Sequence, residues 1–408
     1  MKKLFLLGAL LLVSAFTVAQ EKIPTWTVQP KQGIVKGDYY KVEERFRQGH
    51  LGILEVVKDN GKIIHVEFNE LTRPNYYNRF YQNVSKRLSS YNFTMAEKNG
   101  AAWIEGVAAA ENQMVKEQRL TGNFDIVAGA SNSIEQSLIP LAEKLNSQID
   151  KKTNAKYYSI AENFGDGITG FLKVIVDNGK IVECRYDEIF ADSQDEIKSA
   201  TLKKFYRQSK YWSITYDEPS RIGFNVQMDA LNDKVVTTQN LLDITGLPAT
   251  EKSGNYKKSG FTRRNTAWDN YLKLAQKLQV ELEKDNVLLV KQYRPAVGKI
   301  TLEIPAGLLE KNEVPSEAAN RELEEETGYR AENLEKICEY YMSPGVNSGK
   351  FYLYYTDSLI KTHQNLDEDE FLEVEKVDLN KLELSSLADA KSILAVEYAK
   401  KKRKIGWI

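Results

Sequence analysis

The chain has 408 residues, a length typical of two to four domains. Its 56 Lys and Arg residues nearly balance its 57 Asp and Glu residues, which argues against a general nucleic-acid-binding surface. Only Cys184 and Cys338 occur, and the three histidines lie far apart, so the sequence argues against a disulfide framework and a zinc site.

The first twenty residues have the pattern of a secretory signal peptide. Lys2 and Lys3 precede an apolar run from Leu4 to Phe16, and small residues before Gln20 provide a cleavage site. We therefore expect residues 1–19 to be a signal peptide and the mature protein to be secreted or extracytoplasmic, with no other membrane contact. An uncleaved anchor is the alternative, but the apolar run is short for a membrane span.

An internal repeat follows, with an offset of 118 residues between its copies (52 + 118 = 170). GILEVVKDNGKIIHVEFNE (Gly52–Glu70) aligns with GFLKVIVDNGKIVECRYDE (Gly170–Glu188). Alternating apolar and polar residues around an Asp-Asn-Gly turn are typical of a β-hairpin, so each copy predicts one. Helices rich in aromatic and basic residues are expected next, near Tyr76–Ser90 and Asp195–Ser209. The polar stretch Asn146–Asn154 suggests that the copies occupy residues 20–150 and 151–284.

Each copy then reaches a loop of small residues before an amphipathic helix. The first loop is Asp125–Ser131 (DIVAGAS) and the second contains Ser259–Thr262 (SGFT). Backbone amides at a helix start can bind a phosphate, although an ordinary capped turn is the alternative.

With their hairpins, both copies resemble the FMN-binding repeat of extracytoplasmic flavoproteins. The resemblance implies FMN as a cofactor, attached through a phosphoester to Ser131 in the first copy and Thr262 in the second. It also implies a flavin transferase and electron-transfer partners. Ala128 departs from the usual Ser or Thr, and Tyr256 and Phe261 depart from the pattern in the second copy. A degenerate repeat retained only for its fold is therefore the alternative.

The C-terminal part, residues 285–408, opens with two apolar runs that predict buried strands, Val287–Val290 and Thr301–Ile304. A helix is predicted over Pro315–Thr327, because proline suits the first helical turn and Gly328 can end the helix. On this helix Glu322, Glu325 and Glu326 are at positions i, i+3 and i+4, and share one face. Such carboxylates repel one another unless a cation neutralises them, and hard divalent cations prefer oxygen ligands. A solvated acidic face is the alternative.

The spacing of Gly, Arg and Glu from Gly307 to Tyr329 (GLLEKNEVPSEAANRELEEETGY) resembles the Nudix box, except that Tyr329 replaces the usual aliphatic residue. Four neighbouring segments narrow the resemblance to the ADP-ribose pyrophosphatase branch: Gln292–Arg294, Glu303–Gly307, Ser343–Gly345 and Leu387–Lys391. The resemblance implies an α/β/α sandwich, Mg²⁺ or Mn²⁺ as a cofactor, and hydrolysis of the pyrophosphate in a nucleoside diphosphate-type small molecule.

The resemblance also assigns site residues. The implied catalytic set is Arg321, Glu322, Glu325 and Glu326, and the three glutamates bind metal together with the Ala306 carbonyl. We expect Arg321 to pair with a box carboxylate rather than with substrate, and Glu303 or Glu325 to orient the reacting groups. The substrate-binding residues are expected to be Arg294 and Glu303, since a guanidinium can bind a phosphate bidentately. A surface ion pair is the alternative for Arg294.

Two departures from the branch stand out. Asn347–Gly349 occupies the place of a glutamate that commonly follows the Ser-Pro-Gly loop and serves catalysis. Glu368 or Glu370 can substitute for it, although a solvated acidic loop is the alternative. The usual first core strand is also missing, unless a short strand at Gln279–Leu282 replaces it.

The sequence thus predicts an α+β protein in which two FMN-binding-like repeats precede a Nudix sandwich. The predicted function is a magnesium-dependent Nudix pyrophosphatase with an ADP-ribose-like substrate, joined to secreted flavin-binding repeats. Extracellular FAD as the substrate would reconcile an extracellular location with pyrophosphate hydrolysis, because cleavage of FAD yields AMP and FMN. The alternative is an extracytoplasmic FMN-carrying redox protein with an inactive, truncated Nudix domain.

Overall fold

The computed structural model describes residues 26–46, 49–94, 96, 100–125, 129–213, 223–248, 266–284, 286–366, 371–379 and 382–405. The predicted signal peptide, Thr262 and the acidic residues Glu368 and Glu370 lie outside the described residues. Within the described part of the chain, no helix has the length and apolar character needed to cross a membrane.

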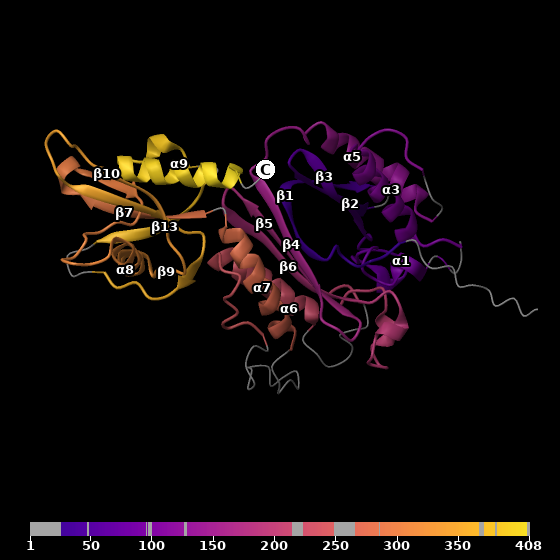
Figure 1. The fold of residues 1–408 in the computed structure, drawn as a ribbon. Coiled ribbons are helices and arrows are strands. Elements are labelled where there is room, and N and C mark those ends of the chain that lie inside the picture. The colour runs from indigo at the N-terminus through magenta and orange to yellow at the C-terminus, as the bar shows by residue number, and fades with distance from the viewer. Residues whose placement is uncertain are drawn as a thin grey trace, which may run out of the picture.

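One six-stranded antiparallel sheet forms the centre of the N-terminal part (Figure 1). The first copy supplies β1 (Gly33–Phe46), β2 (His50–Asp59) and β3 (Lys62–Leu71), and the second supplies β4 (Ala155–Asn163), β5 (Ile168–Asp177) and β6 (Lys180–Phe190). The hairpins predicted around Asp-Asn-Gly are β2–β3 and β5–β6. Asn60 and Asn178 have φ values of 49° and 51°, and each precedes a glycine with positive φ, as a tight hairpin turn requires.

The two copies meet at β1 and β4, which pair antiparallel in the strand order β3-β2-β1-β4-β5-β6. Asp38 lies opposite Lys156, and these residues occupy the same position in the two copies (38 + 118 = 156). The sheet therefore has an approximate two-fold relation about this pair. The copies complete one continuous sheet and do not form two separate ones.

Two longer helices of each copy pack against this sheet. They are α3 (Trp103–Glu117) and α5 (Ile139–Asn146) in the first copy, and α6 (Phe224–Thr238) and α7 (Thr266–Glu283) in the second. Gln118 and Gln239 end α3 and α6 in the left-handed conformation. The side chain of each bonds both backbone groups of one hairpin residue, Ile63 in the first copy and Ile181 in the second. The same contact thus fixes helix to hairpin twice.

The helices predicted near Tyr76–Ser90 and Asp195–Ser209 are wrong. These segments contain only the short turns η2 (Arg79–Tyr81), η4 (Gln194–Glu196) and η5 (Lys203–Phe205). Backbone bridges tie Ser85 to Leu71 and Ser209 to Ile189. The backbone groups that a helix would use internally are partly committed to the strand ends. The described part of the first copy also contains the short elements α1 (Tyr91–Thr94), α4 (Ser131–Ser133) and the π-helical η3 (Ile134–Leu138).

A buried ion pair lies on the opposite face of the sheet from the main helices. Lys173 Nζ is 3.0 Å from Glu55 Oε1, and the Tyr39 hydroxyl donates to the same oxygen at 2.6 Å. Their strands, β2 and β5, are separated by β1 and β4 in the sheet order, so these two long side chains reach toward each other over the intervening strands. Glu55 and Lys173 occupy the same position in the two copies (55 + 118 = 173). Opposite charges at one repeated position therefore meet and hold the copies together.

A second repeated pair gives a prediction about packing. Glu70 pairs with Lys86 in the first copy, and Glu188 pairs with Lys210 in the second. Glu188 Oε1 also accepts from the Tyr186 hydroxyl at 2.8 Å, but the equivalent residue in the first copy is Phe68 (68 + 118 = 186). Among the described residues, Glu70 Oε1 is buried without a hydrogen-bond partner.

Phe68→Tyr is expected to raise the free energy of unfolding by about 1 kcal/mol, because the new hydroxyl can donate to Glu70. Urea unfolding followed by tryptophan fluorescence measures this, since four of the five tryptophans lie in the repeats: Trp26, Trp103, Trp212 and Trp268. The reciprocal change Tyr186→Phe is the control and is expected to destabilise by about 1–2 kcal/mol. A loss of stability in Phe68→Tyr would show that the first copy has no room for the hydroxyl.

Asp187 makes the stability of the sheet depend on pH. The carboxyl is buried, and burial raises its pKa to about 7. A folded-state pKa above the unfolded value stabilises the fold at low pH, and this contribution is lost as the pH rises toward 7. Asp187→Asn keeps an acceptor for the Tyr211 and Glu188 amides, which Oδ1 binds at 3.1 and 2.8 Å.

We expect Asp187→Asn to exceed the wild type in unfolding free energy by on the order of 3 kcal/mol near pH 8, with the difference vanishing toward pH 4. Urea titrations at several pH values, followed by tryptophan fluorescence, test this. Asp229→Asn is the control, since Asp229 is half exposed. Equal pH dependence of Asp187→Asn and the wild type would contradict the prediction.

The C-terminal part places its strands between two helices, α8 (Pro315–Thr327) and α9 (Ala390–Ile405) (Figure 1). A three-stranded antiparallel sheet has the order β13-β7-β8, with β7 at Asn286–Arg294, β8 at Lys299–Glu303 and β13 at Leu372–Asp378. Two separate pairs are β10 (Glu335–Tyr341) with β11 (Lys350–Tyr355), and β9 (Tyr329–Ala331) with β12 (Leu359–Lys361). The short turn η7 (Pro295–Val297) lies between β7 and β8, and η8 (Leu384–Ser386) lies between β13 and α9.

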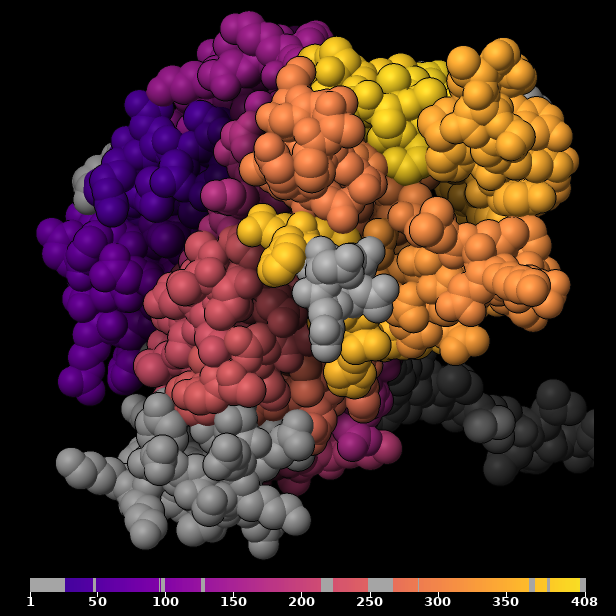
Figure 2. All heavy atoms as spheres, turned by 90° about the vertical axis from the view of Figure 1, so that its left-hand side faces the viewer, coloured from indigo at the N-terminus to yellow at the C-terminus, as the bar shows by residue number. Residues whose placement is uncertain are grey.

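The short strand predicted at Gln279–Leu282 is wrong, because these residues belong to α7. Leu274 and Leu278 are buried on the repeat core, and Leu282 packs against the same core, so the helical apolar period continues through the residues predicted to form the strand. Figure 2 shows the C-terminal part, in orange and yellow, against the second repeat. Lys376 Nζ lies 2.6 Å from Glu283 Oε1 and joins the two parts.

Candidate active site

Helix α8 has the bounds that its start and stop signals predict. Pro315 occupies the first turn, and the Gly328 amide bonds the Glu324 carbonyl at 2.8 Å with φ of 71°. Ala318 on the inner side of the helix is buried. The helix therefore presents Glu322, Glu325 and Glu326 along the face beside the Ala306–Gly307 loop.

Arg321 organises this acidic face. Its Nε and Nη2 bind both oxygens of Glu313 at 3.0 and 3.2 Å, and Nη1 donates to Glu325 Oε2 at 2.8 Å. Nη2 also donates to the Leu308 carbonyl at 3.1 Å and lies 2.9 Å from Glu322 Oε1. These contacts raise the pKa of Arg321, mainly through the bond to Glu313. One guanidinium thus joins the loop to the helix.

Two close contacts join the glutamates to the loop. Glu326 is 3% exposed, and its Oε2 accepts the Ala306 amide at 3.0 Å. The Glu322 carboxyl lies against the α-carbon of Gly307, where an added Cβ would be 1.8 Å from Glu322 Cδ. Only glycine allows this approach. The loop and the helix therefore bring the predicted metal ligands together at one end of the sheet.

The residues fit a hard divalent cation by their chemistry. Four carboxylates, Glu313, Glu322, Glu325 and Glu326, surround the single Arg321, which leaves excess negative charge and oxygen donors. No group of three acidic, His or Cys side chains is already arranged around one point in the described part of the chain. Arg321 contacts three of these four carboxylates, all except Glu326, and Glu326 accepts the Ala306 amide. Metal binding would therefore require rotation of these side chains.

Arg294 and Glu303, the predicted substrate-binding residues, bind each other. Arg294 donates from Nε and Nη2 to the two Glu303 oxygens at 2.9 and 2.8 Å. Lys391 Nζ adds a contact of 2.6 Å, and Thr301 donates at 2.6 Å. The bond from Arg294 is the largest cause of the lowered pKa of Glu303. Glu303 is thus an anchor for two cations, and Arg294 retains further N–H groups.

Lys391 is a site residue whose role was not predicted from the sequence. It lies 88 positions from Glu303 in the chain, and no local pattern joins them. The only sequence signal that points to Lys391 is its position at the end of the Leu387–Lys391 segment. In the structure this position lies in the first turn of α9.

The predicted flavin-attachment residues lie far from this site in the sequence. Ser131 begins the three-residue helix α4 and is half-buried, while Thr262 lies outside the described residues. Asp125, which opens the predicted loop, donates its amide to Gln113 Oε1 at 2.9 Å. Glu368 and Glu370 also lie outside the described residues, and Asn347 Oδ1 accepts the Gly349 amide at 2.5 Å.

Comparisons with known proteins find matches to the C-terminal part of the chain. The model of the NUDIX domain family matches residues 278–396. The chain is 40% identical over 122 residues to the ADP-ribose pyrophosphatase of Bacillus subtilis (strain 168), which covers 28% of this chain and 66% of that protein. It is 38% identical over 104 residues to the ADP-sugar pyrophosphatase of Mus musculus, covering 26% and 48%.

A further relative is the GDP-mannose pyrophosphatase of Cronobacter sakazakii (strain ATCC BAA-894). It is 33% identical over 129 residues, with 28% of this chain and 67% of that protein covered. The chain thus spans between about half and two thirds of the length of these curated relatives.

Proposed function

The chain belongs to the NUDIX family through its C-terminal domain, and we propose that this domain hydrolyses the pyrophosphate of a nucleoside diphosphate derivative of the ADP-ribose type. The observation that supports the proposal is the acidic face of α8, which Arg321 and the Ala306–Gly307 loop hold in one place. The relatives named for ADP-ribose and ADP-sugar pyrophosphatase activity support the substrate type.

The residues have distinct roles in this proposal. Glu322, Glu325 and Glu326, with the Ala306 carbonyl, would hold Mg²⁺ or Mn²⁺, which supplies Lewis acidity toward phosphate oxygens and activates water. Arg321 orients the ligands and does not contact substrate. Glu303 fixes the direction of Arg294, whose remaining N–H groups can bind a phosphate oxygen.

Incubation of the purified protein with Mg²⁺ and either ADP-ribose or FAD tests the proposal. Chromatography is expected to show AMP, together with ribose 5-phosphate or FMN. FAD is included because its hydrolysis releases FMN, which is the cofactor that the resemblance implies for the repeats of the same secreted chain. Absence of AMP from both substrates would overturn the proposed function.

The alternative function is an extracytoplasmic redox protein in which Ser131 carries FMN and the Nudix domain is inactive. The duplicated fold supports two equivalent units, and the resemblance of both copies to the FMN-binding repeat supports flavin. Mass spectrometry of the intact protein and of its proteolytic peptides, after secretion from a flavinylating host, tests it. An FMN-sized increment on the Ser131 peptide is expected under this alternative, and a mature N-terminus at Gln20 would show export.

A further inference from the structure

Tyr329 is the residue at which the segment Gly307–Tyr329 departs from the Nudix box. It directly follows Gly328, which ends α8, and it begins β9. The centre of its ring lies 5.3 Å from Lys376 Nζ on β13. An aliphatic side chain has no aromatic face that attracts a cation. The tyrosine therefore makes a contact that the usual residue of the box cannot make.

Lys376 contacts Tyr329 and the second repeat at the same time. Its Nζ lies 2.6 Å from Oε1 of Glu283, the last residue of α7. Burial lowers the pKa of Lys376, but hydrogen bonding to Glu283 and to Tyr329 raises this pKa overall. The ammonium group is therefore held between a carboxylate of the repeat and an aromatic ring at the end of α8.

Helix α7 gives Glu283 a fixed position. Leu274 and Leu278 of this helix are fully buried in the core of the second repeat. Near the end of the helix, the buried carboxylate of Glu281 accepts a hydrogen bond from Lys36 of β1. Because β1 belongs to the first copy, the end of α7 is tied to both copies. The packing of the repeats thus sets the position of Glu283.

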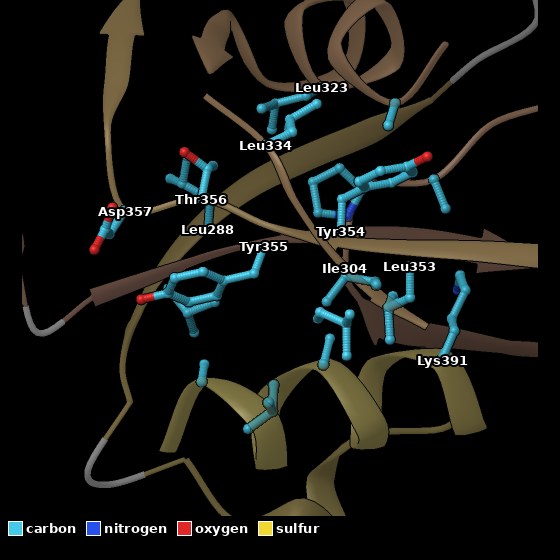
Figure 3. A pocket seen from close by; sticks show the side chains of 18 of the residues that line it. Leu288, Ile304, Leu323, Leu334, Leu353, Tyr354, Tyr355, Thr356, Asp357 and Lys391 are labelled. Carbon is cyan, nitrogen blue, oxygen red and sulfur yellow. The ribbon is translucent and has the colours of Figure 1, made fainter. Parts of the chain in front are cut away.

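On the other side of Lys376, Tyr329 adjoins the last turn of α8, which carries Glu326. Figure 3 shows Leu323 pointing from α8 toward the strands, with Leu334 close by, so apolar packing holds the helix before its last turn. The Tyr329 amide donates to Thr327 Oγ1 at 3.2 Å, which joins the tyrosine to that last turn. A displacement of Tyr329 would therefore change the position of the Glu326 carboxylate.

A second ion pair in the same sheet provides a comparison. Lys291 on β7 lies 2.7 Å from Glu375 on β13, and both side chains are partly exposed, as are those of Lys376 and Glu283. Such a pair by itself contributes little stability. The pair of Lys291 joins two strands of one domain, whereas the pair of Lys376 joins two domains and continues through the Tyr329 ring to α8.

We propose that Glu283, Lys376 and Tyr329 are positioning residues, through which the repeats fix the last turn of α8 and the proposed metal ligand Glu326. The inference rests on the proposed function, and it gives the repeats a part in hydrolysis that does not require flavin. The three residues act through Glu326 and do not contact the substrate.

Tyr329→Leu introduces an aliphatic residue of the kind usual in the box, and we expect it to lower kcat for AMP release from ADP-ribose about fivefold. The KM should stay within about twofold, because no substrate contact is lost. Lys376→Met and Glu283→Gln should lower kcat similarly, and Glu283→Gln combined with Tyr329→Leu should add no further loss, since both changes break one contact. Lys376→Arg keeps the cation and should stay within about twofold of the wild type. Lys291→Met is the matched control and should leave kcat unchanged.

Amide hydrogen exchange examines the last turn of α8 without catalysis, and so separates this inference from the proposed function. Exchange there is expected to rise about fivefold in Glu283→Gln, a change on the surface of a repeat helix, and to stay unchanged in Lys291→Met. Glu283→Gln and Lys376→Met repeat the test if Tyr329→Leu fails to fold.

Unchanged exchange, or raised exchange with unchanged kcat, would overturn the inference and leave the proposed function standing, as would losses in kcat that add in the double variant. Raised exchange in Glu283→Gln, without AMP release even from the wild type, would support the link between the repeats and α8 and overturn the proposed hydrolysis.

Discussion

Glu326→Gln is expected to lower kcat/KM for hydrolysis of the nucleoside diphosphate by about 100-fold or more, with the fold intact. Glu326 is nearly inaccessible, and its Oε2 accepts the Ala306 amide at 3.0 Å. Glutamine keeps an acceptor oxygen for that amide and has almost the same shape. It removes one negative charge from the proposed metal ligands, so the loss should fall on metal-dependent chemistry.

The matched control for this change is Glu324→Gln on the same helix. The Glu324 carboxylate is one-third exposed and lies 3.7 Å from Arg330, away from the loop. AMP release at several Mg²⁺ concentrations measures both variants, and circular dichroism checks their folding. Glu324→Gln is expected to stay within about twofold of the wild type, since an exposed pair contributes little. Full activity in a folded Glu326→Gln variant would remove this residue from the metal site.

The sequence predicts the elements whose signals are local. Helix α8 begins at Pro315 and ends at Thr327 as predicted, because proline, the i, i+3, i+4 pattern and Gly328 all lie within one segment. The two hairpins form at their Asp-Asn-Gly turns for the same reason. These signals act over a few residues and do not depend on the rest of the fold.

Features that depend on tertiary contacts were beyond the sequence. Ser85 and Ser209 bridge to strand ends, and this competition removes the helices predicted around them. The strand predicted at Gln279–Leu282 is helical because its apolar side chains extend the buried face of α7. Lys391 reaches Glu303 across 88 positions, so neither residue alone indicates the contact.

Once the structure is known, the duplication explains the contact between Glu55 and Lys173. Glu55 and Lys173 occupy one repeated position, and the approximate two-fold relation brings that position of each copy toward the centre. Two copies with identical residues there would bury like charges together, at a large cost. The repeat alignment therefore contains the information, but only the pairing of β1 with β4 shows that the two residues meet.

Arg321→Lys is expected to reduce kcat about 10- to 100-fold and to raise the Mg²⁺ concentration required for half-maximal activity. Lysine keeps the positive charge but lacks the planar fork, so it cannot bind Glu313, Glu325 and the Leu308 carbonyl together. The helix and loop would then hold Glu322 and Glu325 less firmly. Stability should fall by less than about 1 kcal/mol, because the Arg321 side chain is about one-third exposed.

The kinetic parameter that changes identifies the role of Arg321. A residue that orients metal ligands should lower kcat and weaken the response to Mg²⁺, whereas a residue that binds substrate should raise KM instead. Arg330→Lys is the control, because Arg330 lies in β9, is 62% exposed, and its guanidinium is 3.7 Å from the Glu324 carboxylate. Steady-state AMP release at varied substrate and Mg²⁺ concentrations measures both effects. A change confined to KM would place Arg321 in contact with substrate, and would mean that Glu313 and Glu325 are held in place without it.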